Sequence, residues 1–205
     1  TEYTLKTAKG CIRVSLPNFA GEFQIMNSLQ AAAVALSYGI SPENVRDTFA
    51  KIQGVKGRME QVRAHEKQNI HIFIDYAHTP DALEKLLRSI RSMRAEGQRI
   101  VLLFGCGGNR DRSKRAPMGR VAEELADFTI ITSDNSRNEE PKQIIKDILE
   151  GMQDINRRRV IMNRRAAIEY AIINAKKNDI LEVEIEGLDE QKAYETLINI
   201  FKENI

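Results

Sequence analysis

From residue 70 onward the chain repeats one pattern, a short apolar stretch followed by a longer amphipathic stretch of helical period. Alternating strands and helices of this kind are typical of βα units, which form parallel sheets. The three clearest repeats are IHIFIDYA with PDALEKLLRSIRSM, RIVLLFG with MGRVAEELA, and FTIITS with PKQIIKDILEGM. A fourth unit is predicted as a short RVIM strand, a helix over 164–177, a strand near 180–185 and a closing helix from Asp189. The sequence therefore predicts an α/β, Rossmann-like fold with a mostly parallel sheet and helices on both faces.

The first 56 residues follow another pattern and predict a small hairpin with two helices. A turn is expected at Lys9-Gly10, because the residues after it alternate between apolar and polar side chains. The expected elements are a hairpin arm over 11–16, a helix over 22–38 that ends at Gly39, and a helix from the N-cap Ser41 to about Gly54. Glycines at both ends of the segment 54–57 indicate a joint between two domains.

Length, charge and cysteine content exclude several classes of protein. A chain of 205 residues has room for at most two domains. Its 31 basic and 29 acidic residues nearly balance, so no field that would hold a nucleic acid is expected. No apolar run approaches the roughly 20 residues that span a bilayer, and a cytoplasmic protein without a membrane partner is predicted. Cys11 and Cys106 lack the spacing of a zinc site and are expected to be free thiols.

Polar clusters follow three of the predicted strands directly. In open parallel sheets, ligands bind beyond the carboxyl ends of the strands, where helix N-termini and loops converge. The clusters are Asp-Tyr-Ala-His-Thr-Pro at 75–80, Gly-Cys-Gly-Gly-Asn-Arg-Asp-Arg at 105–112, and Thr-Ser-Asp-Asn-Ser-Arg at 132–137. Ordinary solvated loops would lie at either end of the sheet. Their common place at the carboxyl edge predicts a ligand site there.

The first cluster allows both a functional and a structural interpretation. Asp75 can accept hydrogen bonds from ligand hydroxyls, or from backbone N–H groups of the next turn. His78 can hold a phosphate or a ribose, or it can fill the turn. Thr79 is better explained as the N-cap of the helix that Pro80 opens, and it needs no ligand.

The second cluster combines glycines with basic side chains. The glycines at 105, 107 and 108 permit close backbone approach and free dihedral angles. The basic side chains can clamp a carboxylate or a phosphate, or form a solvated loop, and they are Arg110, Arg112, Lys114 and Arg115. The loop is not a Walker A motif, because Ser113 precedes the lysine and an arginine follows it. Cys106 is expected to be a packed thiol and not a nucleophile.

The third cluster has the functional groups that bind an amino acid. Asp134 offers an acceptor for an ammonium group, Asn135 an amide that donates and accepts, and Arg137 a fork for a carboxylate. The same residues can also form an Asx turn without any ligand. The basic residues at 157–159 and 164–165 are expected to be solvated, with no role.

Taken together, four motifs resemble the Mur ligase family, in particular its diaminopimelate-adding type. They are GRME at 57–60, DYAHTPDALEK from Asp75, FGCGGNRDRSKR from Phe104 and TSDNSRNEEP from Thr132. Upstream, GEFQIMNSLQAAAVAL resembles a helix of the family's central domain, and the likeness covers roughly 1–180. The resemblance implies that 1–56 is the end of the central ATPase domain and that 57–205 is the C-terminal domain.

The resemblance implies a function in peptidoglycan precursor synthesis. The family's ATP-dependent ligases of this type, which use Mg²⁺, add meso-diaminopimelate to UDP-N-acetylmuramoyl-L-alanyl-D-glutamate through an acyl phosphate. The implied ATP contacts are Asn27, Arg58, Asp75 and His78. The implied contacts of the amino-acid substrate are Arg110, Asp134, Asn135 and Arg137. No catalytic residue and no metal ligand is assigned in this chain.

The sequence departs from the family pattern in its tail, 180–205. The family's GKGHE motif is replaced by Leu-Glu-Val-Glu-Ile-Glu-Gly at 181–187, while Gln24 and Ser136 replace an asparagine and a proline. A phosphate loop and a UDP-sugar domain are also missing, so the chain alone is expected to be inactive without N-terminal and ATPase domains. A catalytically silent nucleotide- or amino-acid-binding module therefore stays an alternative. A folate polyglutamate ligase is not expected to carry the Asp-Asn-Ser-Arg cluster.

Overall fold

The computed structural model describes residues 1–8, 10–17, 19, 21, 23–63, 70–184, 195 and 199. The chain divides into two compact units, Thr1–Glu60 and Gln61–Ile205, and each has its own apolar core. Within the described ranges, no helix is both long enough and apolar enough to cross a membrane. The closing helix expected from Asp189 and the tail that replaces the GKGHE motif lie outside the described residues, apart from 181–184, 195 and 199.

The first unit contains the predicted hairpin and two helices. Its elements are β1 (Glu2–Thr7), β2 (Gly10–Ser15), α1 (Phe23–Ser37) and α2 (Pro42–Phe49). The two strands pair antiparallel, and Gly39 takes the left-handed conformation expected after the first helix. The second helix is shorter than predicted, since it ends at Phe49 and not near Gly54. Ile52 packs against the core from the segment after the helix.

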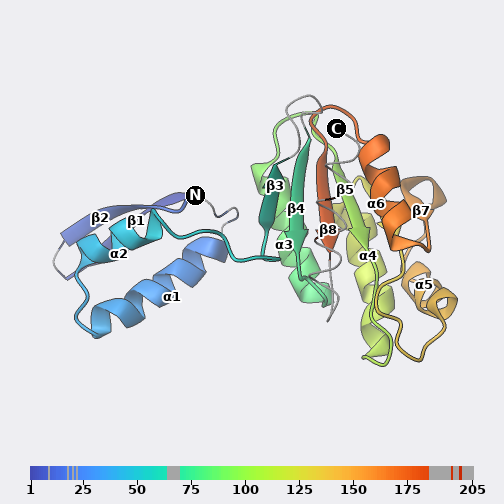
Figure 1. The fold of residues 1–205 in the computed structure, drawn as a ribbon, viewed down its shortest axis with the longest axis horizontal. Helices are drawn as coiled ribbons and strands as arrows, with labels where there is room; N and C mark the ends of the chain where they lie inside the picture. The colour runs from blue at the N-terminus through green and yellow to red at the C-terminus, as the bar shows by residue number, and fades with distance from the viewer. Residues whose placement is uncertain are drawn as a thin grey trace. The chain divides into compact units, whose positions relative to one another are not determined.

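The second unit is built on a six-stranded sheet with the order β3-β4-β8-β5-β6-β7. Figure 1 shows β3, β4, β8 and β5 in this order. The pairs β4–β8, β8–β5, β5–β6 and β6–β7 are parallel, as the alternating pattern predicted. The strands are β3 (Glu60–Arg63), β4 (His71–Asp75), β5 (Ile100–Phe104), β6 (Phe128–Ile131), β7 (Arg158–Val160) and β8 (Ile180–Glu184). β3 and the central position of β8 in the sheet were not predicted from the sequence.

β8 follows the other strands in the sequence and lies between β4 and β5. Its start is fixed by Asp179, which is buried and accepts two hydrogen bonds from Arg99, the residue before β5. The backbone N–H of Ile180 in turn donates to the carbonyl of Arg99, 2.8 Å away. This ion pair sets the register of the central strand at the amino end of the sheet.

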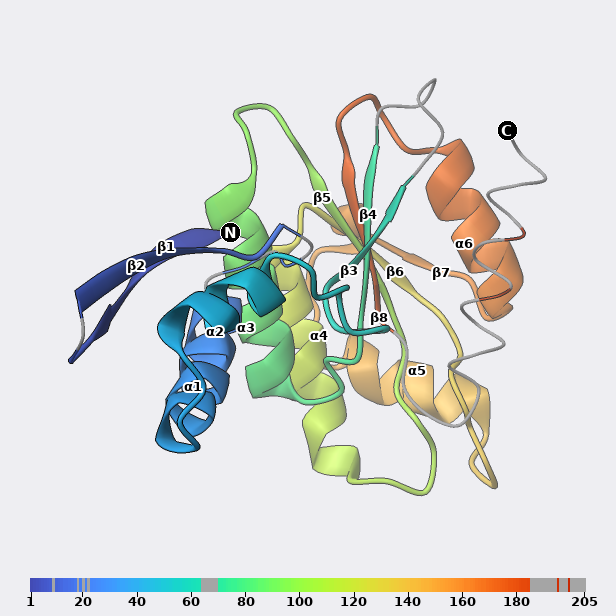
Figure 2. The same cartoon turned by 60° about the vertical axis from the view of Figure 1, so that its left-hand side comes forward.

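Helices cover both faces of the sheet, as expected (Figure 2). α3, α4 and α5 pack against one another on one face, while α6 packs on the other. Their bounds are α3 (Pro80–Met93), α4 (Arg115–Leu125), α5 (Pro141–Leu149) and α6 (Arg164–Ile173). The α6 core includes Ile72, Ile74, Leu103, Leu181 and Val183, so alternate residues of β4, β5 and β8 face α6. The residues between them face α3 and α4.

Candidate functional site

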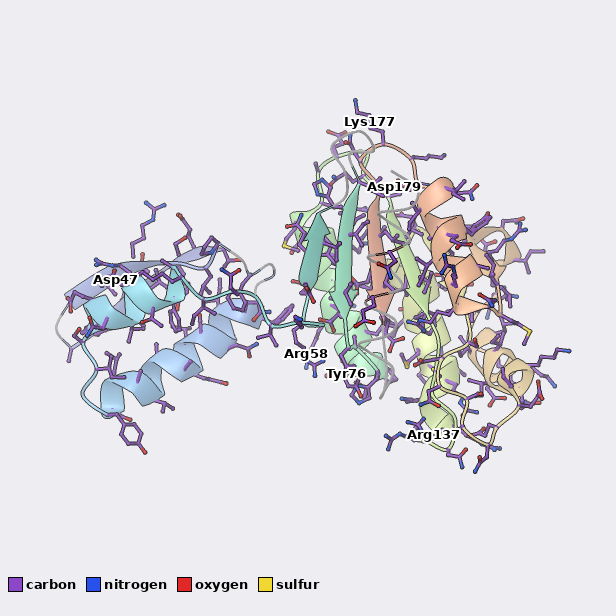
Figure 3. The ribbon with its side chains drawn as sticks, viewed as in Figure 1. Asp47, Arg58, Tyr76, Arg137, Lys177 and Asp179 are labelled. Carbon is purple, nitrogen blue, oxygen red and sulfur yellow. The ribbon has the colours of Figure 1, made fainter. Side chains whose placement is uncertain are left out.

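The three polar clusters lie at one end of the sheet, the carboxyl ends of the strands. Figure 3 shows Tyr76 and Arg137 at this end and Asp179 at the opposite end. Hydrogen bonds join the clusters there: the ammonium group of Lys114 donates to the carbonyl of His78 over 2.8 Å, and the N–H of Gly108 donates to the carbonyl of Asn135, also over 2.8 Å. The structure therefore brings together the three strand ends that the sequence singled out.

The first cluster, after β4, is held largely by its own residues. Asp75 is buried and lies directly beside Glu184 of β8 in the parallel register. The Nδ1 atom of His78 lies 3.0 Å from the carbonyl oxygen of Tyr76, and the two rings are 4.8 Å apart. A carbonyl only accepts, so Nδ1 carries the proton in this contact and Nε2 is the acceptor of the neutral ring.

Thr79 caps α3, as the sequence predicted. Its hydroxyl oxygen accepts a hydrogen bond from the N–H of Ala82 at 3.2 Å, and Pro80 opens the helix. Asp81 in the first turn pairs with Lys85 one turn later. The start of α3 is thus fixed by local chemistry, and this positions the turn that contains His78.

The β5–α4 loop (105–114) and the β6–α5 loop (132–140) are bonded to each other at several points. Besides the bond from Gly108 to Asn135, the guanidinium of Arg137 donates across the loops to the carbonyl of Gly108 at 2.8 Å. Within its own loop it also donates to the carbonyl of Asn135 at 3.3 Å. The N–H of Asn138 donates to the side-chain oxygen of Asn109 over 3.1 Å. The predicted amino-acid residues Arg110, Asp134, Asn135 and Arg137 all lie on these two loops.

Glycines allow this close approach, but not through unusual dihedral angles. A Cβ atom on Gly108 would lie 1.8 Å from the carbonyl oxygen of Ser136, and one on Gly105 would lie 2.5 Å from that of Thr132. Neither glycine takes a positive φ. The prediction of close backbone approach is confirmed, and the expected use of free dihedral angles at these two positions is wrong.

The interpretation of Arg115, the basic residue that begins α4, needs correction. Arg115 is fully buried and donates to the carboxylates of Glu139 and Asp147, so it is neither solvated nor a free clamp. Arg112 also pairs with Glu139, at 3.0 Å. These contacts hold the pKa of Glu139 at about 2, mainly through the hydrogen bond from Arg115. Of this basic set, only Arg110 was assigned to the substrate.

Asp134 lies in a partly buried setting next to an arginine that sequence reasoning left without a role. Its carboxylate is 3.8 Å from the guanidinium of Arg164, which also donates to the carbonyls of Ser133 and Glu184. Arg164 is the first residue of α6. The sequence contained one signal for this contact, a basic residue at the start of a helix near the strand ends. A solvated arginine would have the same local sequence, so the signal does not distinguish the two cases.

Two predicted ATP contacts, Asn27 and Arg58, belong to the first unit. Asn27 is an exposed residue of α1 whose side-chain nitrogen lies 3.4 Å from the side-chain oxygen of Gln24. Arg58 is exposed and lies in the segment after α2. The other two, Asp75 and His78, lie in the second unit. The structure therefore assembles the amino-acid set within one unit, whereas the ATP set is divided between two.

No metal site is built by the described side chains, since no three His, Cys, Asp or Glu residues among them lie together in a suitable group. Both cysteines are free thiols, Cys11 exposed and Cys106 buried with its sulfur 3.8 Å from that of Met118. A cavity of about 170 Å³ lies elsewhere, between α6 and the strands β5 and β6, and residues such as Val101, Ile130 and Ala171 line it.

In a comparison with protein families, residues 57–183 match the model described as Mur ligase, glutamate ligase domain. A UDP-N-acetylmuramoyl-L-alanyl-D-glutamate–2,6-diaminopimelate ligase of Clostridium acetobutylicum is 42% identical over 164 residues, which are 80% of this chain and 33% of the relative. The ligase of the same name from Trichormus variabilis is 40% identical over 176 residues, 86% of this chain and 35% of the relative. The chain thus spans about a third of the length of the curated relatives it matches.

Solved structures of Mur ligases also superpose on this chain. A structure of a UDP-N-acetylmuramoyl-L-alanyl-D-glutamate–2,6-diaminopimelate ligase superposes with a TM-score of 0.63 and 31% identity, over 97% of this chain and 42% of that one. The MurF ligase of Thermotoga maritima in complex with ADP superposes with a TM-score of 0.69 over 100% of this chain and 44% of that one. At 12% identity the second comparison concerns the fold alone.

Proposed function

Because the chain belongs to the Mur ligase family, with residues 57–183 as its glutamate ligase domain, we propose that it is part of a diaminopimelate-adding ligase of peptidoglycan precursor synthesis. The names of its 40–42% identical relatives support this specificity. The reaction is assigned to the cytoplasm, where ATP is available and where free thiols such as Cys11 and Cys106 persist.

The proposed reaction has two steps. The D-glutamate carboxylate of UDP-N-acetylmuramoyl-L-alanyl-D-glutamate attacks the γ-phosphorus of ATP, which releases ADP and leaves an acyl phosphate. The amino group of meso-diaminopimelate then attacks the acyl carbon, and phosphate leaves with the bonding electron pair while the amine loses a proton. Mg²⁺ would accompany ATP, and among the described residues no cluster of three or more His, Cys, Asp or Glu side chains is assigned to it. The chain is therefore assigned no step through the metal.

The single observation that carries the proposal is the pair of cross-bonded loops at the carboxyl edge of the sheet. They present an acid at Asp134, an amide at Asn135 and guanidinium groups at Arg110 and Arg137. An amino acid needs an acceptor for its ammonium group and a donor fork for each carboxylate. A second guanidinium suits a substrate with a second carboxylate, which meso-diaminopimelate has and lysine lacks.

Four residues are proposed as contacts of the nucleotide. Asp75 and His78 would contact the ribose and its surroundings, and Arg58 would contact the nucleotide as well. Asn27 would be a further contact from residues 1–56, proposed as the end of the ATPase domain. Residues 57–205 are proposed as the C-terminal domain. In this view the chain supplies the amino-acid end of the reaction, and other domains supply the phosphate loop and the UDP-sugar site.

Titration calorimetry with meso-diaminopimelate and with L-lysine tests the proposal. We expect Arg137→Ala to weaken meso-diaminopimelate binding by about 1.5–3 kcal/mol, the value of a charge-assisted contact, and to leave lysine binding nearly unchanged. Loss of the loop contact that Arg137 makes with Gly108 would instead weaken both ligands alike. The exposed Arg120→Ala of α4 is the matched control.

Absence of meso-diaminopimelate binding by the wild type at millimolar concentration, with ATP present, would sink the proposal of a working amino-acid pocket. If ADP then binds in a separate titration of the same chain, this would favour the alternative, a catalytically silent nucleotide-binding module. That alternative rests on one observation, the replacement of the family's GKGHE segment by the sequence at 181–187.

A further inference from the structure

One carboxylate, that of Glu139, accepts contacts from three residues of the opposite loop and of α4. Its Oε1 atom accepts from the N–H of Asn109 at 2.5 Å and from Arg115 at 3.0 Å. Its Oε2 atom lies 3.0 Å from Arg115 and 3.0 Å from Arg112. Glu139 itself belongs to the β6–α5 loop, so each of these contacts crosses from one loop system to the other.

Arg115, the main partner of Glu139, anchors this contact to the body of the unit. Its guanidinium is fully buried and also donates to Asp147 of α5 at 2.8 Å and to the carbonyl of Gly107 at 3.4 Å. A buried guanidinium is stabilised when neighbouring carboxylates compensate its charge. Both Nη atoms of Arg115 donate in this way, whereas its Nε has no hydrogen-bond partner among the described residues. Asp147 holds Arg115 to a helix, and Glu139 therefore binds a cation that is already fixed in place.

Both loops contain a non-glycine residue in a left-handed conformation. Asn109 has φ +53° and Arg137 has φ +49°, values that side chains adopt rarely. Contacts across the loops hold both of them: Asn109 donates to Glu139 and accepts from Asn138, and Arg137 donates to Gly108. Such conformations persist where the surroundings impose them, and they gather at ligand sites.

We propose that Glu139 is a positioning residue, which fixes the β5–α4 loop with Arg110 against the β6–α5 loop with Asp134, Asn135 and Arg137. Glu139 does not touch the substrate in this proposal. It sets the spacing between the ammonium-binding and the carboxylate-binding groups. The part of the proposal that concerns the ligand rests on the proposed function, whereas the part that concerns the loops does not.

Amide hydrogen exchange in the 205-residue chain tests the loop step without any ligand. The reporters are the N–H groups of Gly108 and Asn138, which bond across the loops to other partners than Glu139. In Glu139→Gln both should exchange at least tenfold faster, and Glu139→Asp, which keeps the charge, should recover part of the protection. Glu140→Gln removes the same charge from an exposed neighbour and should change neither rate. Unchanged exchange in a folded Glu139→Gln overturns the proposal.

Calorimetric titration of the same variants with meso-diaminopimelate tests the ligand step. Glu139→Gln should raise the Kd at least tenfold, Glu139→Asp should raise it less, and Glu140→Gln should leave it unchanged. If the wild type binds and Glu139→Gln binds equally well, the positioning role is wrong. If the wild type does not bind meso-diaminopimelate, the proposed function is wrong instead. The hydrogen-exchange rates then test only whether Glu139 fixes the two loops against each other. If Glu139→Gln does not fold, Glu139→Asp provides both comparisons.

Discussion

Gly108 sits where the backbone of the neighbouring loop leaves no space for a side chain. A methyl group there would meet the carbonyl oxygen of Ser136 at 1.8 Å, so Gly108→Ala must push the two loops apart. We expect this variant to lose about 1–3 kcal/mol of unfolding free energy, the usual cost of overpacking, in urea denaturation. Ser136→Ala keeps the backbone oxygen and serves as the control. Equal stability of Gly108→Ala and the wild type would show that the loops can separate freely.

Glu139 makes the stability of the second unit sensitive to acid. Arg115 holds the pKa of Glu139 at about 2, below its ordinary value of 4.5, so the charged form stabilises the folded state. This contribution is complete above about pH 4.5 and is lost as the pH falls toward 2. The difference in unfolding free energy between the wild type and Glu139→Gln should therefore shrink on acidification. A difference that stays constant from pH 6 to pH 3, with Glu140→Gln as reference, would contradict this assignment.

For single residues, the sequence predicted the place in the sheet better than the side-chain contacts. The carboxyl edge of the sheet was predicted for four residues because each lies at or after the end of an apolar strand. They are Asp75, Arg110, Asp134 and Arg137. Arg115 could not be recognised as buried, because its partners Glu139 and Asp147 lie 24 and 32 residues away along the chain. Local sequence patterns do not show which carboxylate forms an ion pair with which arginine.

Among the elements, β8 has an unusual residue at its centre. The side chain of Glu182 is fully buried between Phe73 of β4 and Leu102 of β5, and neither carboxyl oxygen has a hydrogen-bond partner among the described residues. Burial raises the pKa of Glu182 well above its ordinary value, and the negative charges of Asp75 and Glu184 raise it further. The folded sheet therefore favours the protonated acid.

Replacement of Glu182 by leucine should stabilise the protein. Removal of a buried polar group without partners is worth about 1–3 kcal/mol, measured at pH 7 by urea denaturation. Because the folded pKa is raised, wild-type stability should fall as the pH rises above about 4.5 and level off above the raised pKa, whereas Glu182→Leu should lose this slope. Exposed Glu96→Leu is the control. A Glu182→Leu variant less stable than the wild type would refute this account.

The periodic spacing of apolar residues predicted most of the helices and strands. It did not predict the order of the strands in the sheet. Strands β4, β5 and β6 and the helices after them were predicted, since apolar runs and caps are local signals. β3 has only four residues, and its sequence EQVR carries little apolar signal. The place of β8 depends on contacts such as Arg99 with Asp179, which are 80 residues apart and invisible to any local pattern.

For the whole molecule, we expect removal of the first unit and removal of β8 to affect the cooperative unfolding of the second unit differently. A chain of residues 57–205 keeps all strands of the second core and should unfold cooperatively in a thermal melt followed by circular dichroism. A chain of residues 1–178 loses β8 with buried Ile180, Leu181 and Val183, each worth about 1.5–3 kcal/mol against a total of roughly 5–15 kcal/mol. We expect it to show no cooperative transition of the second unit. Cooperative melting of 1–178 would contradict the central role of β8.

The central place of β8 also affects how the protein is made. A ribosome adds about 5–20 residues per second, so roughly 4–15 s pass between completion of β5 at residue 104 and arrival of β8 at residue 180. During that interval β4 and β5 each have an unpaired edge, which can associate with other nascent chains. Slow codons between 104 and 180 would prolong this exposure, and chaperone demand should be greatest then.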